Sequence, residues 1–343
     1  MGVAFPPAIL NQKTYATFEG GRCLESLPKL CLGLLSEQKK VWDDLREGCK
    51  SSKHAKERDL SCREFTVRLQ HNPRRMKSSL AGVAEKNMTD RPCFLCLDHL
   101  PEVQKGILYR KEYLILCNPM PVLSFHFTIS HLDHRPQTIS EHIDAFFQFM
   151  VDFGSGWTIL YNGPKCGASA PDHHHFHAAR SGEMPIEKEI LDKKRLVLMK
   201  KVERVLLYRV KNAGRETLIL EGDDPVAVGH LFKDYLSSLK KVLSTDEEPM
   251  INMAGFYGKK RWRLMVFPRR KHRPDAFFKE GDNRIVVSPG VIEMGGLLVT
   301  PMEKDFERLD ETAVESIYEE VSLEGAIVER AIDEMDNQKT YQS

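Results

Sequence analysis

Three segments carry apolar residues at helical spacing. They lie at residues 24–48 (after Pro28), 139–152 and 225–243, and they predict amphipathic helices. Alternating apolar residues and short apolar runs predict strands at 65–69, ended by Asn72-Pro73, and at 107–117, 122–129, 156–162 and 173–179. Residues 251–274 and 285–301 are strand-like, 184–212 predicts a helix or strand between two halves, and the polar residues 50–60 predict a linker or exposed loop.

This order of elements is typical of an α+β fold with an antiparallel sheet. The stretch "WRLMVFPRRKHRP" in the second half loosely echoes "FHFTISHLDHRP" in the first, which suggests a duplicated unit. We therefore expect a helical N-terminal extension over residues 1–60 and a first α+β half over residues 61–212. A second α+β half over residues 213–343 follows, which the echo suggests is a degenerate repeat.

The charge of the chain is nearly balanced. Its 343 residues include 50 Lys and Arg against 49 Asp and Glu, so no basic field marks nucleic acid as a partner. No run of about 18 apolar residues predicts a membrane span, and the N-terminal stretch lacks the pattern of a secretory signal. The eight cysteines are widely spread, which is typical of reduced thiols. We expect a cytoplasmic protein without a membrane or nucleic-acid partner.

The segment from His173 to His177 holds four histidines in five residues. In a strand, His173, His175 and His177 share one face, while Phe176 and Ala178 can pack on a core from the other. Three aligned imidazoles must be solvated, metal-bound, hydrogen-bonded or catalytic. A surface patch without function, a metal site with three His ligands and a catalytic site all stay open on this pattern alone.

The loop before this strand favours phosphate chemistry. Gly163, Gly167, Ala168 and Ser169 are small, and small residues let backbone N–H groups approach an anion closely. A glycine-containing loop beside histidines suggests an imidazole that attacks phosphorus as a nucleophile. The phosphoramidate formed in this way can pass its nucleotidyl group to a second acceptor.

The segment "GASAPDHHHFHAA" resembles the signature of the histidine-triad (HIT) superfamily, with the Gly-x-Ser-x-x-His-x-His segment of its transferase branch. Upstream, "YLILCNPMPVLSFHFTISHLDHRPQTI", "NPRRMKSS" and "RPCFLC" are similar to segments that precede the triad in this branch. The branch includes galactose-1-phosphate uridylyltransferase, ATP adenylyltransferase (diadenosine tetraphosphate phosphorylase) and GDP-hexose phosphorylases. The resemblance covers residues 63–180 well and the second half more loosely. It implies a HIT-like antiparallel sheet with flanking helices, in two HIT-like halves as in the uridylyltransferase.

The resemblance also implies roles for single residues. His175 would be the nucleophile that takes the nucleotidyl group, and His177 and His173 would contact phosphate or orient the ring. Asn118 would lie near the ribose hydroxyls, Asn162 at the phosphate or leaving group, and Ser169 and the Gly167 backbone at phosphate oxygens. Further candidates for phosphate contact are Arg74 or Arg75, before the cysteine pair, and Lys165 in the loop.

Two departures from the family pattern leave questions open. Asp172 looks like an extra residue before the triad, so an alternative frame makes His174 the nucleophile and places Phe176 third. Strand alternation and the apolar Phe176 favour the first frame. The third position is Gln in uridylyltransferases but His177 here, as in hydrolases and some phosphorylases. Transfer and hydrolysis therefore both stay open.

Cys93 and Cys96 form a C-x2-C pair, which supplies two of the four ligands that zinc needs. The nearby candidates for the other two are His99, His131, His134 and His173. In uridylyltransferases a His before a helix and the first His of the triad segment complete a structural zinc site. The resemblance therefore implies Cys93, Cys96, His134 and His173 here. A pair of free thiols, or a local third ligand at His99, stays an alternative.

A second basic cluster runs from Arg269 to Arg273 in "FPRRKHRP". Its charges are either solvated loop charges or further phosphate contacts, because guanidinium groups suit bidentate phosphate binding. The pattern alone does not decide between the two interpretations.

The residues and the resemblance together predict a nucleotidyltransferase or nucleotide phosphorylase. It would act on an NDP-sugar or a dinucleoside polyphosphate through a covalent nucleotidyl-histidine, with phosphate or a sugar phosphate as acceptor. A hydrolase of the same type, a non-catalytic nucleotide-binding protein and a metal-dependent enzyme with three His ligands stay as alternatives. Members of this branch are often dimers, so the resemblance leaves a homodimer open, while the sequence itself does not give the oligomeric state.

Overall fold

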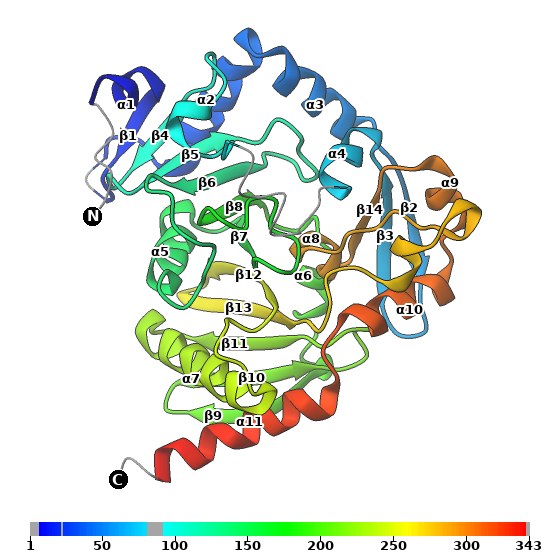
Figure 1. Cartoon of the computed structure of the whole chain (residues 1–343). Coiled ribbons are helices and arrows are strands. Elements are labelled where there is room, and N and C mark those ends of the chain that lie inside the picture. Colours follow the sequence, from blue (N-terminus) through cyan, green and yellow to red (C-terminus); the bar gives the residue numbers. More distant parts are fainter. Residues whose placement is uncertain (1–6, 22, 81–91, 341–343) are drawn as a thin grey trace.

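The computed structural model describes residues 7–21, 23–80 and 92–340 of the chain. Within these ranges a central sheet of eleven strands runs through the molecule (Figure 1). In order across the sheet its strands are β1 (Thr14–Phe18), β4 (Gly106–Tyr109), β5 (Tyr113–Cys117), β6 (Phe127–His131), β8 (His175–Arg180), β7 (Trp157–Asn162), β12 (Ile251–Gly258), β13 (Arg261–Pro268), β11 (Leu218–Gly222), β10 (Val205–Val210) and β9 (Leu196–Val202). All neighbours are antiparallel except β1 and β4.

A second sheet of three strands lies beside one face of the central sheet, on the right in Figure 1. Its order is β14 (Leu297–Thr300), β3 (Thr66–His71) and β2 (Lys56–Ser61), with β14 parallel to β3. The α-helices are α1 (Pro7–Lys13), α2 (Leu27–Val41), α3 (Asp43–Lys53), α4 (Met76–Ser79), α5 (Ile143–Phe153), α6 (Ile186–Glu189), α7 (Pro225–Leu243), α8 (Val291–Met294), α9 (Glu303–Arg308), α10 (Glu311–Val321) and α11 (Gly325–Thr340).

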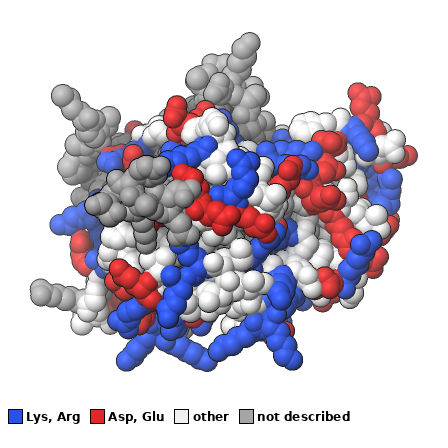
Figure 2. All heavy atoms as spheres, turned by 90° about the horizontal axis from the view of Figure 1, so that it is seen from below, with Lys and Arg blue, Asp and Glu red and all other residues white. Residues whose placement is uncertain are grey.

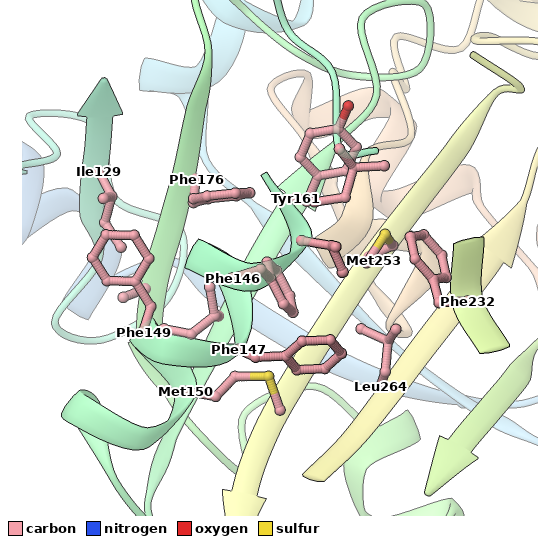
Figure 3. Packing of buried hydrophobic residues seen from close by; sticks show 14 of the residues in the cluster. Ile129, Phe146, Phe147, Phe149, Met150, Tyr161, Phe176, Phe232, Met253 and Leu264 are labelled. Carbon is pink, nitrogen blue, oxygen red and sulfur yellow. The ribbon is translucent and has the colours of Figure 1, made fainter. Parts of the chain in front are cut away.

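The two faces of the central sheet bury two separate cores. On one face, α2, α5 and α7 pack on the strands and α11 packs on α7; Figure 3 shows Phe176 of β8 in this core beside Phe146 and Phe149 of α5. On the other face, Leu160, Ala179 and Met265 pack with the small sheet, α8 and α10. Successive strand residues point to opposite faces, so each central strand contributes to both cores.

The predicted α+β class with an antiparallel sheet is confirmed by this arrangement. The predicted helix at 225–243 is α7, where Asp224 caps the first turn by accepting a hydrogen bond from the Val226 N–H at 3.0 Å and Pro225 occupies the first position. The central sheet continues across residue 212 because β10 pairs with β11. The division of the chain at residues 60 and 212 stays a prediction.

No helix in the described ranges is long and apolar enough to cross a bilayer.

Three local predictions were wrong. Residues 50–60 are not a linker: α3 ends at Lys53 and β2 begins at Lys56, an edge strand whose polar side chains face solvent. Residues 107–117 are not one strand but the hairpin β4–β5, because Arg110 and Lys111 turn the chain with φ of 47° and 59°. Residues 285–301 contain α8 before β14, because a short helical turn follows Gly290.

Candidate functional site

The histidine segment of β8 divides its side chains between the two faces of the sheet. Phe176 is fully buried in the helix-covered core, and the His174 ring stacks on His142 on that side, with centroids 3.7 Å apart. His175 and His177 therefore point to the opposite face, toward the small sheet, with ring centroids 5.2 Å apart. This geometry places His174 in the core and brings His175 and His177 together on the other face.

A hydrogen bond to the backbone fixes the tautomer of His175. Its Nδ1 lies 2.7 Å from the carbonyl oxygen of His173. A carbonyl only accepts hydrogen bonds, so Nδ1 carries the proton and Nε2 of the neutral ring keeps its lone pair. Burial lowers the pKa of His175 and keeps the ring neutral near pH 7. A neutral imidazole with a bare Nε2 is the form that attacks an electrophile.

Gln137 holds the backbone of His175 from the side. Its side chain is 1% exposed, donates from Nε2 to the carbonyl of His175 at 2.9 Å and accepts the His175 N–H at Oε1, 2.8 Å away. The same Nε2 donates to the carbonyl of Asn162 on β7 at 2.9 Å. One amide group therefore connects β7 and β8 at the position of the candidate nucleophile. Sequence reasoning missed Gln137, because a single glutamine in a polar loop carries no pattern.

His126 sets the tautomer of His177 through a chain of donors. Its Nδ1 accepts the backbone N–H of Val122 at 3.4 Å, so its proton lies on Nε2, which faces Nδ1 of His177 at 3.3 Å. His177 then carries its own proton on Nε2. Burial, with the charge of Arg75, lowers the pKa of His126 to about 3, so this neutral state holds near pH 7. Sequence reasoning missed His126, although it directly precedes β6 and lies two residues before Thr128, which pairs with His177.

Arg75 is the predicted basic residue that the structure brings to these histidines. Its positive charge lowers the pKa of His126 and of His177, and its guanidinium donates from Nη1 to the carbonyl of Met120 at 3.2 Å. Burial in turn lowers the pKa of Arg75, and the carboxyl group of Glu293 on α8 partly offsets this. Arg74 is exposed at the start of the same turn. Glu293 is a third neighbour of the site that sequence reasoning missed.

The loop between β7 and β8 is held to α8 rather than open on all sides. Asn162 accepts at Oδ1 from the side chain of Asn252 at 2.8 Å and from the backbone N–H of Val291 at 2.7 Å. Gly167 adopts a φ of 109°, and a Cβ there would lie 2.7 Å from the Cα of Gly290. The glycine is therefore required by close packing as well as by the backbone conformation.

The other residues predicted to contact the nucleotide or its phosphates lie on the loop between β7 and β8 and after β5. Ser169 is exposed in the loop, and Lys165 is exposed in an ion pair with Glu247. Asn118 follows β5, where its Oδ1 accepts the backbone N–H of Met120 at 2.9 Å. Lys165 is thus engaged at the surface. The contacts of Ser169 and Asn118 with a nucleotide stay predictions.

Two cysteines and two histidines meet beside the triad and could hold a metal ion. One ligand atom from each of Cys93, Cys96, His134 and His173 lies within 4.8 Å of all the others. Nε2 of His173 donates to the carbonyl of His131 at 2.8 Å, so the lone pair of its Nδ1 faces Sγ of Cys93, 3.3 Å away. This donor set, two thiols and two imidazoles, is typical of a tetrahedral site.

The surrounding residues complete this candidate metal centre. Nε2 of His134 lies 3.6 Å from a carboxylate oxygen of Asp172, which orients the ring with Nδ1 toward Sγ of Cys96 at 3.2 Å. Asp172, the extra residue before the triad, therefore contacts a member of the cluster. His99 instead lies with Nδ1 3.0 Å from the carbonyl of Cys93 and is outside the cluster found among the described residues.

Comparisons with known proteins agree with this fold. Residues 34–180 match a family model described as a domain of unknown function (DUF4922), and residues 198–333 match one described as the GDPGP1-like C-terminal domain. The structure of yeast Ap4A phosphorylase in complex with Ap4A is similar with a TM-score of 0.55 at 14% identity, over 88% of this chain and 99% of that chain. The complex of the yeast protein with AMP is similar with a TM-score of 0.52 at 16% identity, over 84% and 96%.

At this level of identity the likeness shows the fold, and it confirms the predicted HIT-like sheet with flanking helices. The predicted resemblance to the transferase branch is supported at the level of the fold. The support comes from the match to the GDPGP1-like C-terminal domain and from the similar fold of yeast Ap4A phosphorylase. No curated protein sequence matches the chain.

Proposed function

We propose that this protein is a nucleotidyltransferase of the phosphorylase type, with His175 as the residue that carries the nucleotidyl group. The observation that carries the proposal is the pair of ring atoms on one face of β8. His175 presents a bare Nε2, because its proton is held by the carbonyl of His173 at 2.7 Å, and His177 presents an Nε2–H. A nucleophile and a hydrogen-bond donor thus stand side by side. The GDPGP1-like match and the yeast structure with bound Ap4A support a nucleotide as substrate.

In the first step, the lone pair of Nε2 of His175 forms a bond to the α-phosphorus, and the bond from phosphorus to the leaving oxygen breaks. The ring becomes cationic because it keeps its Nδ1 proton, and the carbonyl of His173 stabilises that charge. The Nε2–H of His177 donates to a phosphoryl or leaving-group oxygen. The positive charge of Arg75 offsets negative charge that develops on the phosphoryl oxygens.

In the second step, an oxygen of the acceptor attacks the same phosphorus and the bond from phosphorus to Nε2 breaks. His175 returns to its neutral form with the Nδ1 proton in place, ready for another turnover. Phosphate or a sugar phosphate as acceptor gives a phosphorylase or transferase, and water would give a hydrolase. The proposed Zn²⁺ at Cys93, Cys96, His134 and His173 is structural, because four protein ligands fill a tetrahedral site.

Intact mass spectrometry tests the covalent step. After mixing with a panel of NDP-sugars and dinucleoside polyphosphates, without acceptor, the protein is expected to gain the mass of one nucleotidyl group, which is that of a nucleoside monophosphate less one water. His175→Ala should gain nothing, because it lacks the attacking nitrogen. His174→Phe keeps the ring packed on His142 and should still form the adduct. If His175→Ala still forms the adduct, or if His174→Phe is the variant that loses it, the alternative frame with His174 as the nucleophile is supported. Free monophosphate without an adduct would point to a hydrolase.

Replacing Gln137 tests whether the backbone clamp matters for catalysis. Gln137→Leu removes the bonds to His175 and should lower kcat by about 10- to 100-fold while changing KM little, because misplacement of a reacting group by about 1 Å costs that much. Gln38→Leu is the matched control. Gln38 is also buried, and its amide group binds two backbone groups away from the histidines, the carbonyl of Val103 at 3.0 Å and the N–H of Lys105 at 2.9 Å. Equal losses of kcat in both variants would show a merely structural role for Gln137.

Metal analysis tests the proposed zinc site. The purified protein is expected to contain about one zinc ion per chain, and Cys96→Ser should contain almost none and unfold at a lower temperature, because metal binding contributes to folding. Cys23→Ser removes a half-buried thiol away from the cluster and should keep its zinc. Equal zinc contents in both variants, or no zinc in any of them, would exclude the site.

A further inference from the structure

The basic cluster from Arg269 to Arg273 begins with an arginine that is not at the surface. Exposed Lys and Arg side chains are interspersed with acidic ones, as Figure 2 shows for one face of the molecule. Arg269 is instead 2% exposed, and its guanidinium donates to backbone carbonyls, among them that of Pro289 at 2.9 Å, and to Oδ1 of Asn252. Burial lowers the pKa of Arg269 to about 10, so the group stays cationic at pH 7 and can only donate hydrogen bonds.

Asn252, Asn162 and His175 lie side by side across three neighbouring strands. Asn252 of β12 pairs with Asn162 of β7. The antiparallel register of β7 with β8, continued by two residues, places Asn162 opposite His175. One donor, Nε2 of Gln137, binds the carbonyls of both Asn162 and His175 at 2.9 Å. Residues directly opposite each other point to the same face of a sheet, with Cβ atoms about 4.5–5.5 Å apart. The amide of Asn162 therefore lies next to the ring of the candidate nucleophile.

The direction of each amide in this row is fixed by partners whose roles cannot change. Arg269 only donates, so the atom of Asn252 that faces it is Oδ1, and Nδ2 of Asn252 donates to the carbonyl of Cys166 at 2.7 Å. The same Nδ2 donates to Asn162 at 2.8 Å, and the backbone N–H of Val291 donates to the same atom of Asn162 at 2.7 Å. That atom must be Oδ1. Nδ2 of Asn162 is thus on the arm of the amide away from Asn252, and among the described residues it has no hydrogen-bond partner.

An amide turned in this way can bind oxygen atoms but cannot move protons. Nδ2 of Asn162 carries two N–H donors, and next to His175 they suit the oxygens of a phosphoryl group that Nε2 attacks. Two glycines keep room around the amide. A Cβ at Gly290 would lie 2.9 Å from Oδ1 of Asn162, and a Cβ at Gly167 would lie 3.3 Å from the same atom. Larger residues at these two positions would push the amide out of its place.

We propose that Arg269 and Asn252 form a buried relay that orients the amide of Asn162, so that its N–H groups bind an oxygen of the phosphoryl group at His175. The proposal rests on the proposed function and deepens it. Asn162 is then a catalytic residue, because it touches the reacting group, and Asn252 and Arg269 are positioning residues that act through it. Arg269 is thus neither a solvated loop charge nor itself a phosphate contact.

Replacing Asn162 by aspartate tests the free donor separately from the bonds to Asn252 and Val291. Asn162→Asp keeps an oxygen that accepts both bonds, and it replaces Nδ2 by a second carboxylate oxygen. The rate of adduct formation should fall about 100-fold, the typical effect of losing one donor to a developing charge. The Kd of the tightest binder among ADP, GDP and UDP should rise about tenfold, because a carboxylate repels phosphate. Asn212→Asp makes the same change in an exposed turn and should alter neither value. A rate and Kd like those of the wild type in Asn162→Asp overturn the proposal.

A double-mutant cycle tests whether Asn252 acts through Asn162. Asn252→Asp still accepts from Arg269 but presents a carboxylate oxygen to Oδ1 of Asn162, which should turn that amide round and lower kcat about tenfold at nearly unchanged KM. In Asn162→Ala the relay has no amide to orient, so adding Asn252→Asp should lower kcat by less than about twofold further. The smaller, uncharged Asn252→Ser takes its place in the cycle if Asn252→Asp does not fold. The full loss of kcat in both backgrounds shows a merely structural role for Asn252 and overturns the relay.

The same measurements separate the relay from the proposed function. If the wild type forms the adduct and neither Asn162→Asp nor Asn252→Asp slows it, the relay is overturned and nucleotidyl transfer stands. If no substrate gives an adduct but the Kd of the nucleoside diphosphate rises in Asn162→Asp and not in Asn212→Asp, the proposed transfer fails. The phosphate contact of Asn162 then stands without it.

Discussion

The hydrogen bond from Nδ1 of His175 to the carbonyl of His173 is the interaction on which the candidate site depends. It decides which ring nitrogen carries the proton and which keeps its lone pair. The carbonyl can only accept a hydrogen bond, so Nδ1 must be the donor. The two partners are separated by a single residue, so the backbone just before β8 must curve to bring the carbonyl under the ring. The conformation of this short stretch therefore determines the chemistry available to the protein.

Several independent contacts hold that stretch in place. The His173 ring belongs to the Cys–His cluster, so the residue that offers the carbonyl is also a candidate metal ligand. Gln137 holds the peptide groups of His175 itself. On the opposite face, Phe176 and His174 pack among the rings of Tyr113 and α5. Neither ring nitrogen of the fully buried His174 has a hydrogen-bond partner among the described residues, which costs about 1–3 kcal/mol. Among the described residues its ring contacts are the stacking on His142 and edge contacts with Tyr113, His131 and Phe176.

Much of this site follows from local sequence pattern, and the rest does not. Strand alternation correctly separates His175 and His177 from Phe176, and the C-x2-C spacing with the family resemblance correctly selects the four members of the cluster. Gln137, His126 and Glu293 were not predicted, because each reaches the site through tertiary contacts between segments far apart in the chain. The charged residues of β2 predict a linker rather than a strand. Its edge position leaves them in solvent, where Asp59 pairs with Arg68 of β3 at 2.8 Å.

The state of the His175 ring is the most direct test of this account. Nitrogen-15 NMR of the labelled protein at pH 7, with His175→Ala to assign the signals, reports which ring nitrogen carries the proton. We predict a neutral ring with the proton on Nδ1 and a bare Nε2, and we predict that this state persists to lower pH than in a free imidazole because burial lowers the pKa of His175. A proton on Nε2, or a cationic ring at pH 7, would contradict the account, because neither form offers a lone pair at the position that faces the candidate site.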